Sequence, residues 1–461
     1  MNLYRLWCYY PFDYDLAIFG QGVWRLSQGE APFVSIRGMN LFGEHATWVH
    51  APFALLAALL RPLADVPTVL VLGQSAALAG AGHLLYRIAG REAGPASALL
   101  VLASYLAYPA LQHTWLEYYE PINLAVPCLV AATQAVREGR DRPALLWSIA
   151  ALLTIENLAA TVAALGVYAA LGAGRRRLGL ALVAISGLYL VFLMQVTFPW
   201  LSERGYVFAD RLYGDFARSL PEAALHLARP DNLVARLATP ANGHYLLGLL
   251  VPVGFLPFAA PLTLVLAVQL PLNMVSSWPY AREIRYHYVA PIIPFVLLAV
   301  VRALALFPPR STRRRLAAGL LAAGLLAGQA LYASPWLIPR EGRRWWRGLE
   351  ADALERKETR ALLERLPGDA SVSAHYRFLP ALCERRRLYM FPDLGPSWPD
   401  ALLVEEVRLA PGSRDEEALG RARGEAGYRE VARTSSGAVL LFREGSGGGE
   451  APLRSPPVAR P

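Results

Sequence analysis

Residues 178–200 read LGLALVAISGLYLVFLMQVTFPW, an apolar run of 23 residues without a charged side chain. A helix that crosses a bilayer needs about 20 predominantly apolar residues. Three more runs of this kind occur at Val66–Tyr86, Val289–Phe307 and Leu316–Ser334, and Arg302 is the only charged residue in them. The chain is therefore predicted to form a polytopic α-helical body in a membrane.

The overall composition agrees with a membrane protein and argues against several other classes. Charged residues make up 18% of the chain, below the ~25% of soluble domains. The net charge of +9 comes almost wholly from arginine, with Lys357 the single lysine. Many arginines lie between apolar runs, which indicates membrane orientation rather than a nucleic-acid partner. The first fifty residues lack the apolar segment of a secretory signal peptide, and the chain has no P-loop, dinucleotide-binding or zinc motif.

Short loops rich in arginine predict which helix ends face the cytoplasm. They contain Arg87 and Arg91, Arg137–Arg142, Arg175–Arg177, and Arg302 with Arg310–Arg315. The acidic or aromatic segments between them are placed outside: His113–Glu120, Glu156–Asn157, Trp200–Gly243 and Asn273–His287. For inside and outside loops to alternate, two long apolar runs must each turn back. The run Pro143–Gly172 would turn at Glu156. The run Tyr245–Leu272 would turn near its three prolines, Pro252, Pro257 and Pro261. About ten transmembrane helices result, with both the first residues and the C-terminal region outside.

Outside the spanning runs, the pattern predicts interfacial helices and a C-terminal domain. Trp48–Leu63 is apolar but short and is expected to lie against the outer interface. Leu220–Thr239 is typical of an interfacial amphipathic helix or of a solvated loop. A helical pattern over Arg340–Arg365 precedes four strand-like runs at Ala370–Ala374, Arg387–Phe391, Ala401–Glu405 and Ala438–Arg443. We therefore expect an outer loop with interfacial helices over residues 1–64, an all-α transmembrane bundle over 65–336, a small extracytoplasmic α/β domain over 337–444 and a disordered tail over 445–461.

Acidic residues and histidines near the start of the chain are candidates for chemistry. Asp15 immediately precedes a predicted helix at Leu16–Leu26. It either caps that helix by accepting from the first N–H groups or acts as general base toward an acceptor hydroxyl. Glu44 and His45 precede the interfacial helix, where His45 either makes an interfacial hydrogen bond or binds a phosphate or sugar. His50 lies five residues after His45, so a two-histidine metal face on one helix is not predicted.

Two further segments place carboxylates among apolar or aromatic residues. HTWLEYYE at residues 113–120 contains Glu117 and Glu120. Aromatic rings stack on sugar faces and carboxylates accept from sugar hydroxyls, but the same composition occurs in the aromatic belt at a membrane interface. Glu156 lies deep in an apolar stretch, where an ionisable residue is a functional candidate by default. The turn predicted at this residue lowers the cost of burying it.

REIRYHY at residues 282–288 lies directly before an apolar run on the predicted outer side. The bias of basic loops toward the cytoplasm therefore does not explain Arg282 and Arg285. A planar guanidinium suits bidentate contacts with phosphate. We predict a lipid-phosphate site that includes His287, with anchoring to anionic headgroups as the alternative.

Several motifs together resemble a known bacterial membrane family. They are YDLAIFGQGVW at residues 14–24, GEH at 43–45, RYHYVAP at 285–291, LPGDASVSA at 366–374 and RRLYMFP at 386–392. Their order and spacing over residues 12–443 resemble the family catalogued as domain of unknown function 2079 (DUF2079). That family is similar to the GT-C class of polytopic glycosyltransferases, which take a sugar from a polyprenyl-phosphate carrier on the outer leaflet.

The resemblance implies roles for individual residues. Asp15 matches the catalytic carboxylate of the first outer loop, His45 falls in the same loop, and Glu156 matches an acidic position of the middle helices. Relatives usually have a membrane helix before this loop, whereas only Met1–Phe12 precede it here. That difference indicates either a misplaced start or the loss of the helix.

The predicted function is the transfer of a sugar from a polyprenyl-phosphate donor to an envelope acceptor at the bacterial inner membrane. Asp15 would deprotonate the acceptor hydroxyl, while Arg282 and Arg285 hold the departing phosphate. Substrate would also contact Glu44, Glu117, Glu120, Glu156 and His287. No metal-ligand set is predicted, although a divalent cation is compatible with this chemistry. The alternatives are a transporter or lipid flippase, which would show broken helices in repeated halves, and a non-catalytic envelope scaffold.

Overall fold

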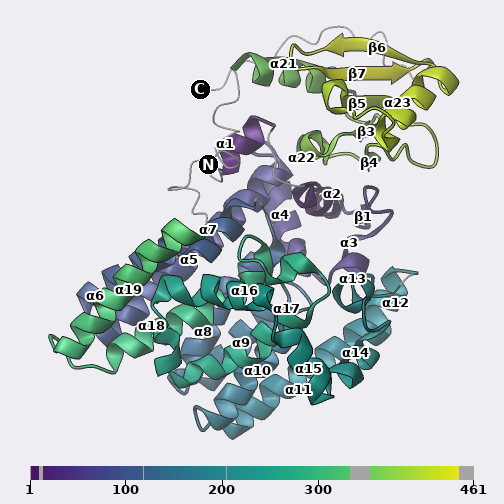
Figure 1. Cartoon of the computed structure of the whole chain (residues 1–461). Coiled ribbons are helices and arrows are strands. Elements are labelled where there is room, and N and C mark those ends of the chain that lie inside the picture. The colour runs from purple at the N-terminus through teal and green to yellow at the C-terminus, as the bar shows by residue number, and fades with distance from the viewer. Residues whose placement is uncertain (1, 10–13, 118, 204, 333–352, 446–461) are drawn as a thin grey trace. The chain divides into compact units, whose positions relative to one another are not determined.

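The computed structural model describes residues 2–9, 14–117, 119–203, 205–332 and 353–445 (Figure 1). Helices make up 67% of the structure, and a small sheet lies toward the C-terminus. The chain divides into two compact units. We call residues 1–38, 54–68 and 347–461 the sheet unit, and residues 39–53 and 69–346 the bundle unit. The domain boundaries predicted at residues 64, 336 and 444 stay predictions.

Helices follow one another closely from residue 41 to residue 331. They are α3 (Leu41–Glu44), α4 (His50–Leu60), α5 (Val66–Ala93), α6 (Pro95–Leu106), α7 (Pro109–Leu116), α8 (Ala125–Arg137), α9 (Asp141–Leu152), α10 (Leu158–Leu171), α11 (Arg176–Phe192), α12 (Phe198–Leu201), α13 (Ala209–Tyr213), α14 (Leu220–Leu227), α15 (Pro230–Leu237), α16 (Pro240–Leu250), α17 (Leu266–Val275), α18 (Ile293–Ala305) and α19 (Thr312–Leu331). Short 3-10 turns join several of them: η1 (Pro121–Leu124), η3 (Val251–Val253), η4 (Leu256–Ala259), η5 (Pro261–Val265), η6 (Pro279–Arg282) and η7 (His287–Val289). A π-helical turn, η2 (Leu193–Thr197), connects α11 to α12. Several helices begin with proline, which suits the first turn because no N–H is needed there.

Two helical stretches among the described residues are long and apolar enough to cross a membrane. They are α5 and the continuous helix Arg176–Leu201, formed by α11, η2 and α12. Shorter apolar helices include α4, α6, α10 and α18. The run predicted at Val289–Phe307 is a regular α-helix only over α18, because the segment before it contains Pro291 and the turn η7. The count of ten transmembrane helices stays a prediction.

Both long runs that were predicted to turn back are interrupted in the structure. The first is broken between α9 and α10, where residues 153–157 form a turn that contains Glu156. The second is broken into η3, η4 and η5 between α16 and α17. Pro252, Pro257 and Pro261 lack the N–H that a continuous helix requires. The two predicted interruptions are confirmed.

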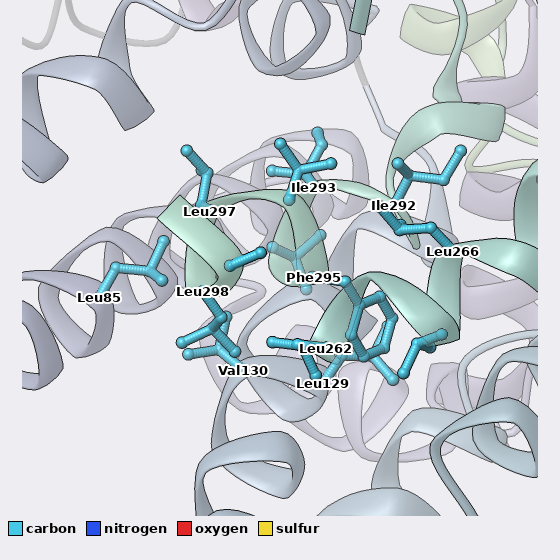
Figure 2. Close-up of a cluster of buried hydrophobic side chains, with 14 of the residues drawn as sticks. Leu85, Leu129, Val130, Leu262, Leu266, Ile292, Ile293, Phe295, Leu297 and Leu298 are labelled. Atoms are coloured by element: carbon cyan, nitrogen blue, oxygen red, sulfur yellow. The ribbon is translucent and has the colours of Figure 1, made fainter. Parts of the chain in front are cut away.

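The helix α18 lies in the hydrophobic core of the bundle unit (Figure 2). Every residue from Ile293 to Leu304 except Arg302 is buried. Figure 2 shows Phe295, Leu297 and Leu298 of α18 with Leu85 of α5, Leu129 and Val130 of α8, Leu262 of η5 and Leu266 of α17. A helix that is apolar on all sides must be covered by neighbours, and α18 accordingly packs against α6, α8, α19, η4 and η5.

Gly324 of α19 lies against the backbone near η3, with no room for a side chain. A Cβ atom there would lie 2.4 Å from the Val251 carbonyl oxygen and 2.6 Å from the Gly254 nitrogen. Backbone atoms of a packed turn cannot move aside freely, so Gly324→Ala is expected to destabilise the protein by about 1–3 kcal/mol. The measurement is the melting temperature of the detergent-purified protein.

Gly319 on the same helix supplies the control, because nothing lies within 4 Å of its Cβ position. Gly319→Ala is expected to keep or raise the melting temperature, since alanine favours the helix by about 1 kcal/mol over glycine. Equal melting temperatures for the two variants would contradict the close contact at Gly324.

The sheet unit begins with short elements and ends with an α/β domain. Its first elements are α1 (Asn2–Trp7), α2 (Asp15–Ser27) and β1 (Phe33–Val34), and β2 (Met39–Asn40) follows in the bundle unit. The later ones are α21 (Ala353–Glu364), β3 (Val372–Ala374), η8 (Tyr376–Phe378), α22 (Leu379–Leu382), β4 (Leu388–Met390), β5 (Ala401–Glu405), η9 (Glu406–Arg408), α23 (Arg414–Glu425), β6 (Tyr428–Arg433) and β7 (Ala438–Arg443).

The five-stranded sheet has the order β4-β3-β5-β7-β6. The strands β4, β3 and β5 are parallel, whereas β7 is antiparallel to β5 and β6. Both faces are covered: Leu403 and Leu440 pack with α21 and α22, and Leu402 and Leu441 pack with α23. All four predicted strands are confirmed. The edge strand β6 was not predicted, because its residues are mostly exposed and polar and show no apolar alternation.

Two other predicted helices appear as α2, within a residue of the expected Leu16–Leu26, and as α4 within Trp48–Leu63. The segment Leu220–Thr239 is helical, but as α14 and α15 rather than as one helix. The reason is Pro230, which cannot donate to the preceding turn and starts a new helix. The helix expected over Arg340–Arg365 lies within the described residues only as α21, and residues 446–461 of the predicted tail lie outside them.

Candidate active site

The first polar cluster joins His45 to Glu156. The side chain of Asn40 caps α3 by accepting from the Phe42 N–H, and His45 follows this helix directly. His45 Nδ1 lies 2.8 Å from Glu156 Oε1, and the Ala46 N–H donates to Glu156 Oε2 at 3.1 Å. The turn between α9 and α10 thus brings Glu156 to a histidine more than one hundred residues earlier.

The surroundings of Glu156 favour its ionised form. Burial alone would raise the pKa of the Glu156 carboxyl, but His45 and the Ala46 N–H hold it below the ordinary value. The Tyr206 hydroxyl also donates to Glu156 Oε1, at 3.4 Å. An ionised carboxylate fixes the orientation of the imidazole, because Nδ1–H donates to it.

The ring of His45 is fixed from a second side. It stacks on Phe208 with ring centroids 4.3 Å apart, and Phe208 in turn meets Tyr206 edge to face. Since Nδ1 faces the carboxylate, Nε2 lies on the opposite side of the ring. A histidine held in this way can donate a proton or a hydrogen bond from Nε2 when it is protonated.

The second polar cluster joins His287 to Glu117 and Glu120. His287 Nδ1 lies 3.5 Å from Glu117 Oε1 and 3.5 Å from Glu120 Oε1. Both glutamates are buried, in the connection between α7 and η1, and η7 packs on both of these elements. Two buried carboxylates and a histidine can accept from several hydroxyls of one polar ligand.

Residues that the sequence analysis did not single out hold this connection in place. Gln74 of α5 accepts from the Glu120 N–H at 2.7 Å and from Asn123 Nδ2 at 3.2 Å. His50 Nε2 lies 2.9 Å from the Tyr119 hydroxyl, which links the connection to the segment that carries His45. Gln74 could have been found in the sequence, because it is a polar residue inside an otherwise apolar run.

The arginine segment lies in loops beside these elements. Arg282 ends η6 and is half-buried, whereas Arg285 is exposed in the connection to η7. Asn273 of α17 anchors this connection by donating to the Tyr288 carbonyl oxygen at 3.0 Å. Glu44 is a buried residue at the end of α3. These positions leave the phosphate-binding role of the two arginines a prediction.

The polar clusters and the arginine-rich loops mark opposite ends of α5. Gln74 is bound to the Glu120 connection, while Glu92 pairs with Arg137 at 2.7 Å and with Arg302 at 3.5 Å. Glu92 lies 18 positions after Gln74, a distance of about 27 Å along a helix, close to the thickness of the bilayer core.

Comparison with known proteins decides the family. The model of a family described as "Predicted membrane protein (DUF2079)" matches residues 5–417. The chain belongs to the DUF2079 family. A search of curated proteins finds no match for this DUF2079 protein. The resemblance to this family predicted from the motifs is thereby confirmed.

A solved structure shares the fold of this DUF2079 protein. It is ArnT from Cupriavidus metallidurans bound to undecaprenyl phosphate, with a TM-score of 0.54 and 14% sequence identity. The match covers 95% of this chain and 96% of ArnT. The predicted likeness to the GT-C class is confirmed at the level of fold.

Asp15 lies in the other unit of this DUF2079 protein. It is the first residue of α2, and the preceding Tyr14 makes no side-chain capping bond. An aspartate in the first turn is favoured by the partial positive charge of the helix N-terminus. Tyr14, not Asp15, therefore holds the N-cap position, and the role of Asp15 as general base stays a prediction.

The described residues of this DUF2079 protein contain no group of three or more histidine, cysteine or acidic side chains placed to hold a metal ion. The predicted substrate residues include two glutamates and a histidine near one another, but their geometry does not form such a group. The compatibility of this chemistry with a divalent cation stays a prediction.

Proposed function

We propose that this DUF2079 protein is a membrane glycosyltransferase. It would transfer a sugar from a polyprenyl-phosphate donor to an envelope acceptor on the outer face of the bacterial inner membrane. The proposal is supported by the fold shared with ArnT, whose solved structure contains undecaprenyl phosphate. The family description as membrane proteins agrees with this location.

One observation carries the proposal: buried acidic side chains and histidines converge from distant parts of the bundle unit. His45 meets Glu156, and His287 meets Glu117 and Glu120. Burying ionisable groups is costly and is seldom retained in a membrane body without a function. Two such clusters, joined through the His50–Tyr119 contact, support a polar substrate site rather than simple packing.

The ends of α5 support the predicted orientation. Arg137 and Arg302 pair with Glu92, which lies about 27 Å from Gln74 along the helix axis. Arginine-rich loops mark the cytoplasmic side. The polar clusters would then face outside, as would the α/β domain, in a bundle of about ten transmembrane helices.

The proposed reaction is a displacement at the anomeric carbon of the donor sugar. Asp15 takes the proton of the acceptor hydroxyl, whose oxygen bonds to the anomeric carbon. The bond from that carbon to the phosphate oxygen breaks, and polyprenyl phosphate leaves. Arg282 and Arg285 pair with the leaving phosphate, and His45, when protonated, donates to it from Nε2. Such contacts stabilise charge as it develops.

The substrate residues would hold the donor sugar. Glu117 and Glu120 accept from its hydroxyls, with His287 between the two carboxylates. Glu44 contributes a further carboxylate from α3, and Glu156 acts through His45.

The assay that tests this function uses the purified chain in liposomes with a radiolabelled polyprenyl-phosphate sugar. Transfer of label to a membrane acceptor, with release of polyprenyl phosphate, is the expected result. In a deletion strain, undecaprenyl-linked sugar should accumulate. Uptake of labelled substrate into the liposomes without any transfer would instead identify a transporter. If the chain shows neither transfer nor uptake, the envelope scaffold is the favoured alternative.

Glu156→Gln is expected to lower kcat by about 100-fold. Glutamine has nearly the same size but no charge, so it no longer stabilises a protonated His45. One of its amide hydrogens would also face a donor, because both carboxylate oxygens now accept. The measurement is the rate of transfer in liposomes at saturating donor.

Glu138→Gln is the matched control, because Glu138 is exposed near the arginine-rich end of the bundle unit. This variant should transfer sugar at the rate of the unaltered chain. If Glu156→Gln shows the same full rate, the His45–Glu156 pair has no part in the reaction.

A further inference from the structure

The order of the parallel strands marks one point on the edge of the C-terminal sheet. The chain runs from β3 to its neighbour β4 and then crosses to the other side of β3 to form β5. The direction of winding therefore reverses between β3 and β5. In open α/β sheets, ligands bind outside the carboxyl ends of the strands at such a point. His375 directly follows β3 there, and Glu405 ends β5.

His375 presents a buried N–H at this point. The Glu405 backbone N–H donates to His375 Nδ1 at 2.8 Å. Burial lowers the pKa of His375, although the charges of Glu405 and Asp415 act in the opposite direction. Burial thus favours the neutral ring, in which the proton lies on Nε2 because Nδ1 accepts. Nε2 lies 3.6 Å from Asp415 Oδ2 and makes no hydrogen bond within the described residues.

Glu405 presents a buried acceptor beside it. Its Oε1 accepts from Arg377 at 2.7 Å and lies 3.1 Å from Arg408 Nε. Its Oε2 accepts no hydrogen bond from the residues that the structure describes. The Glu405 and His375 residues are 3% and 8% exposed. A donor and an acceptor buried in this state carry a free-energy cost until both find a partner.

We propose that this sheet edge binds a saccharide. A hydroxyl group both donates and accepts, so the hydroxyls of a sugar can accept from His375 Nε2–H and donate to Glu405 Oε2. The charge of Glu405 is already balanced by Arg377 and Arg408, which favours a neutral ligand over an ammonium group. Tyr376, the next residue, is 43% exposed and offers a ring for a sugar face. The ligand enters by displacing the side chain of Asp415, which is 39% exposed, while Arg377 and Arg408 stay paired with Glu405.

The site lies wholly within the sheet unit and does not depend on the proposed transferase activity. Its test is saturation-transfer NMR on the full-length protein in detergent, without any donor lipid. Glucose, galactose, mannose and N-acetylglucosamine are added one at a time. At least one of the four is expected to bind, and the signal identifies the sugar protons in contact.

Two variants separate this site from others. His375→Asn keeps an acceptor near the position of Nδ1 but removes the Nε2–H donor, so binding should weaken about tenfold or more. Tyr376→Ala removes an exposed ring without opening the core and should weaken binding severalfold. His83→Asn, at an exposed histidine of α5, should leave binding unchanged. Melting temperatures report whether each variant is folded.

A bridging water would satisfy the same donor and acceptor. In that case none of the four sugars binds, and the proposal is overturned. It is also overturned if both His375→Asn and Tyr376→Ala bind the sugar as tightly as the unaltered chain. If His375→Asn does not fold, the Tyr376→Ala result alone decides.

Discussion

Asp15→Asn is expected to reduce sugar transfer by about 10²–10⁴-fold, the contribution of a general base. Asparagine keeps the size and hydrogen-bonding capacity of the side chain but cannot take the proton of the acceptor hydroxyl. Asp15 is the first residue of α2, and asparagine is also tolerated in the first turn of a helix, so folding should persist. The measurement is the single-turnover rate with radiolabelled polyprenyl-phosphate sugar in liposomes.

The control for this variant is Asp369→Asn, at an exposed aspartate of the same sheet unit. It should transfer sugar at the full rate. Binding of the donor lipid by the Asp15→Asn variant, measured separately, should be nearly unchanged, because the base acts on the acceptor. A full transfer rate in Asp15→Asn would remove this mechanism.

Arg377→Met is expected to destabilise the protein by about 3–5 kcal/mol, the cost of breaking a buried ion pair. Arg377 donates to Glu405 at 2.7 Å and to Glu355 at 3.0 Å, and its side chain is 3% exposed. Methionine has a similar length but no charge, so two carboxylates lose the cation between them. The measurement is thermal unfolding of the purified protein, followed by a probe of the C-terminal domain.

Arg386→Met supplies the comparison, because Arg386 pairs with Glu30 at the surface and is 68% exposed. A pair of this kind contributes about 0–1 kcal/mol. Unfolding temperatures that drop equally in both variants would mean that the Arg377 network adds no more than a surface contact.

Local sequence rules predicted most elements of the fold. The break at Glu156 followed from the run length and from the arginines at 175–177, and the break after α16 followed from three prolines. The strands β3, β5 and β7 are buried. Their apolar composition was therefore enough to predict them as strands. The edge strand β6 is polar because one side faces solvent. It forms a strand because it pairs with β7, which lies later in the chain, and a local pattern could not predict that pairing.

The candidate site was predicted as residues but not as contacts. Sequence composition pointed to His45 and Glu156 separately, while their 2.8 Å contact depends on how α3 and the α9–α10 turn pack. The same holds for His287 with Glu117 and Glu120. Long-range packing of this kind has no local signal in one sequence. The buried donor and acceptor at His375 and Glu405 went unnoticed for that reason, since strand order alone brings them together.

The helix α5 connects the Glu120 segment to the arginines that pair with Glu92, and in the proposed orientation these lie toward opposite membrane faces. Gln74 near one end holds the Glu120 connection, and Glu92 near the other end holds Arg137 and Arg302. A bilayer with longer acyl chains would tilt or shift such a helix to match its apolar length. The spacing of the carboxylates would then respond to lipid chain length, and membrane thickness would become a regulator of the reaction.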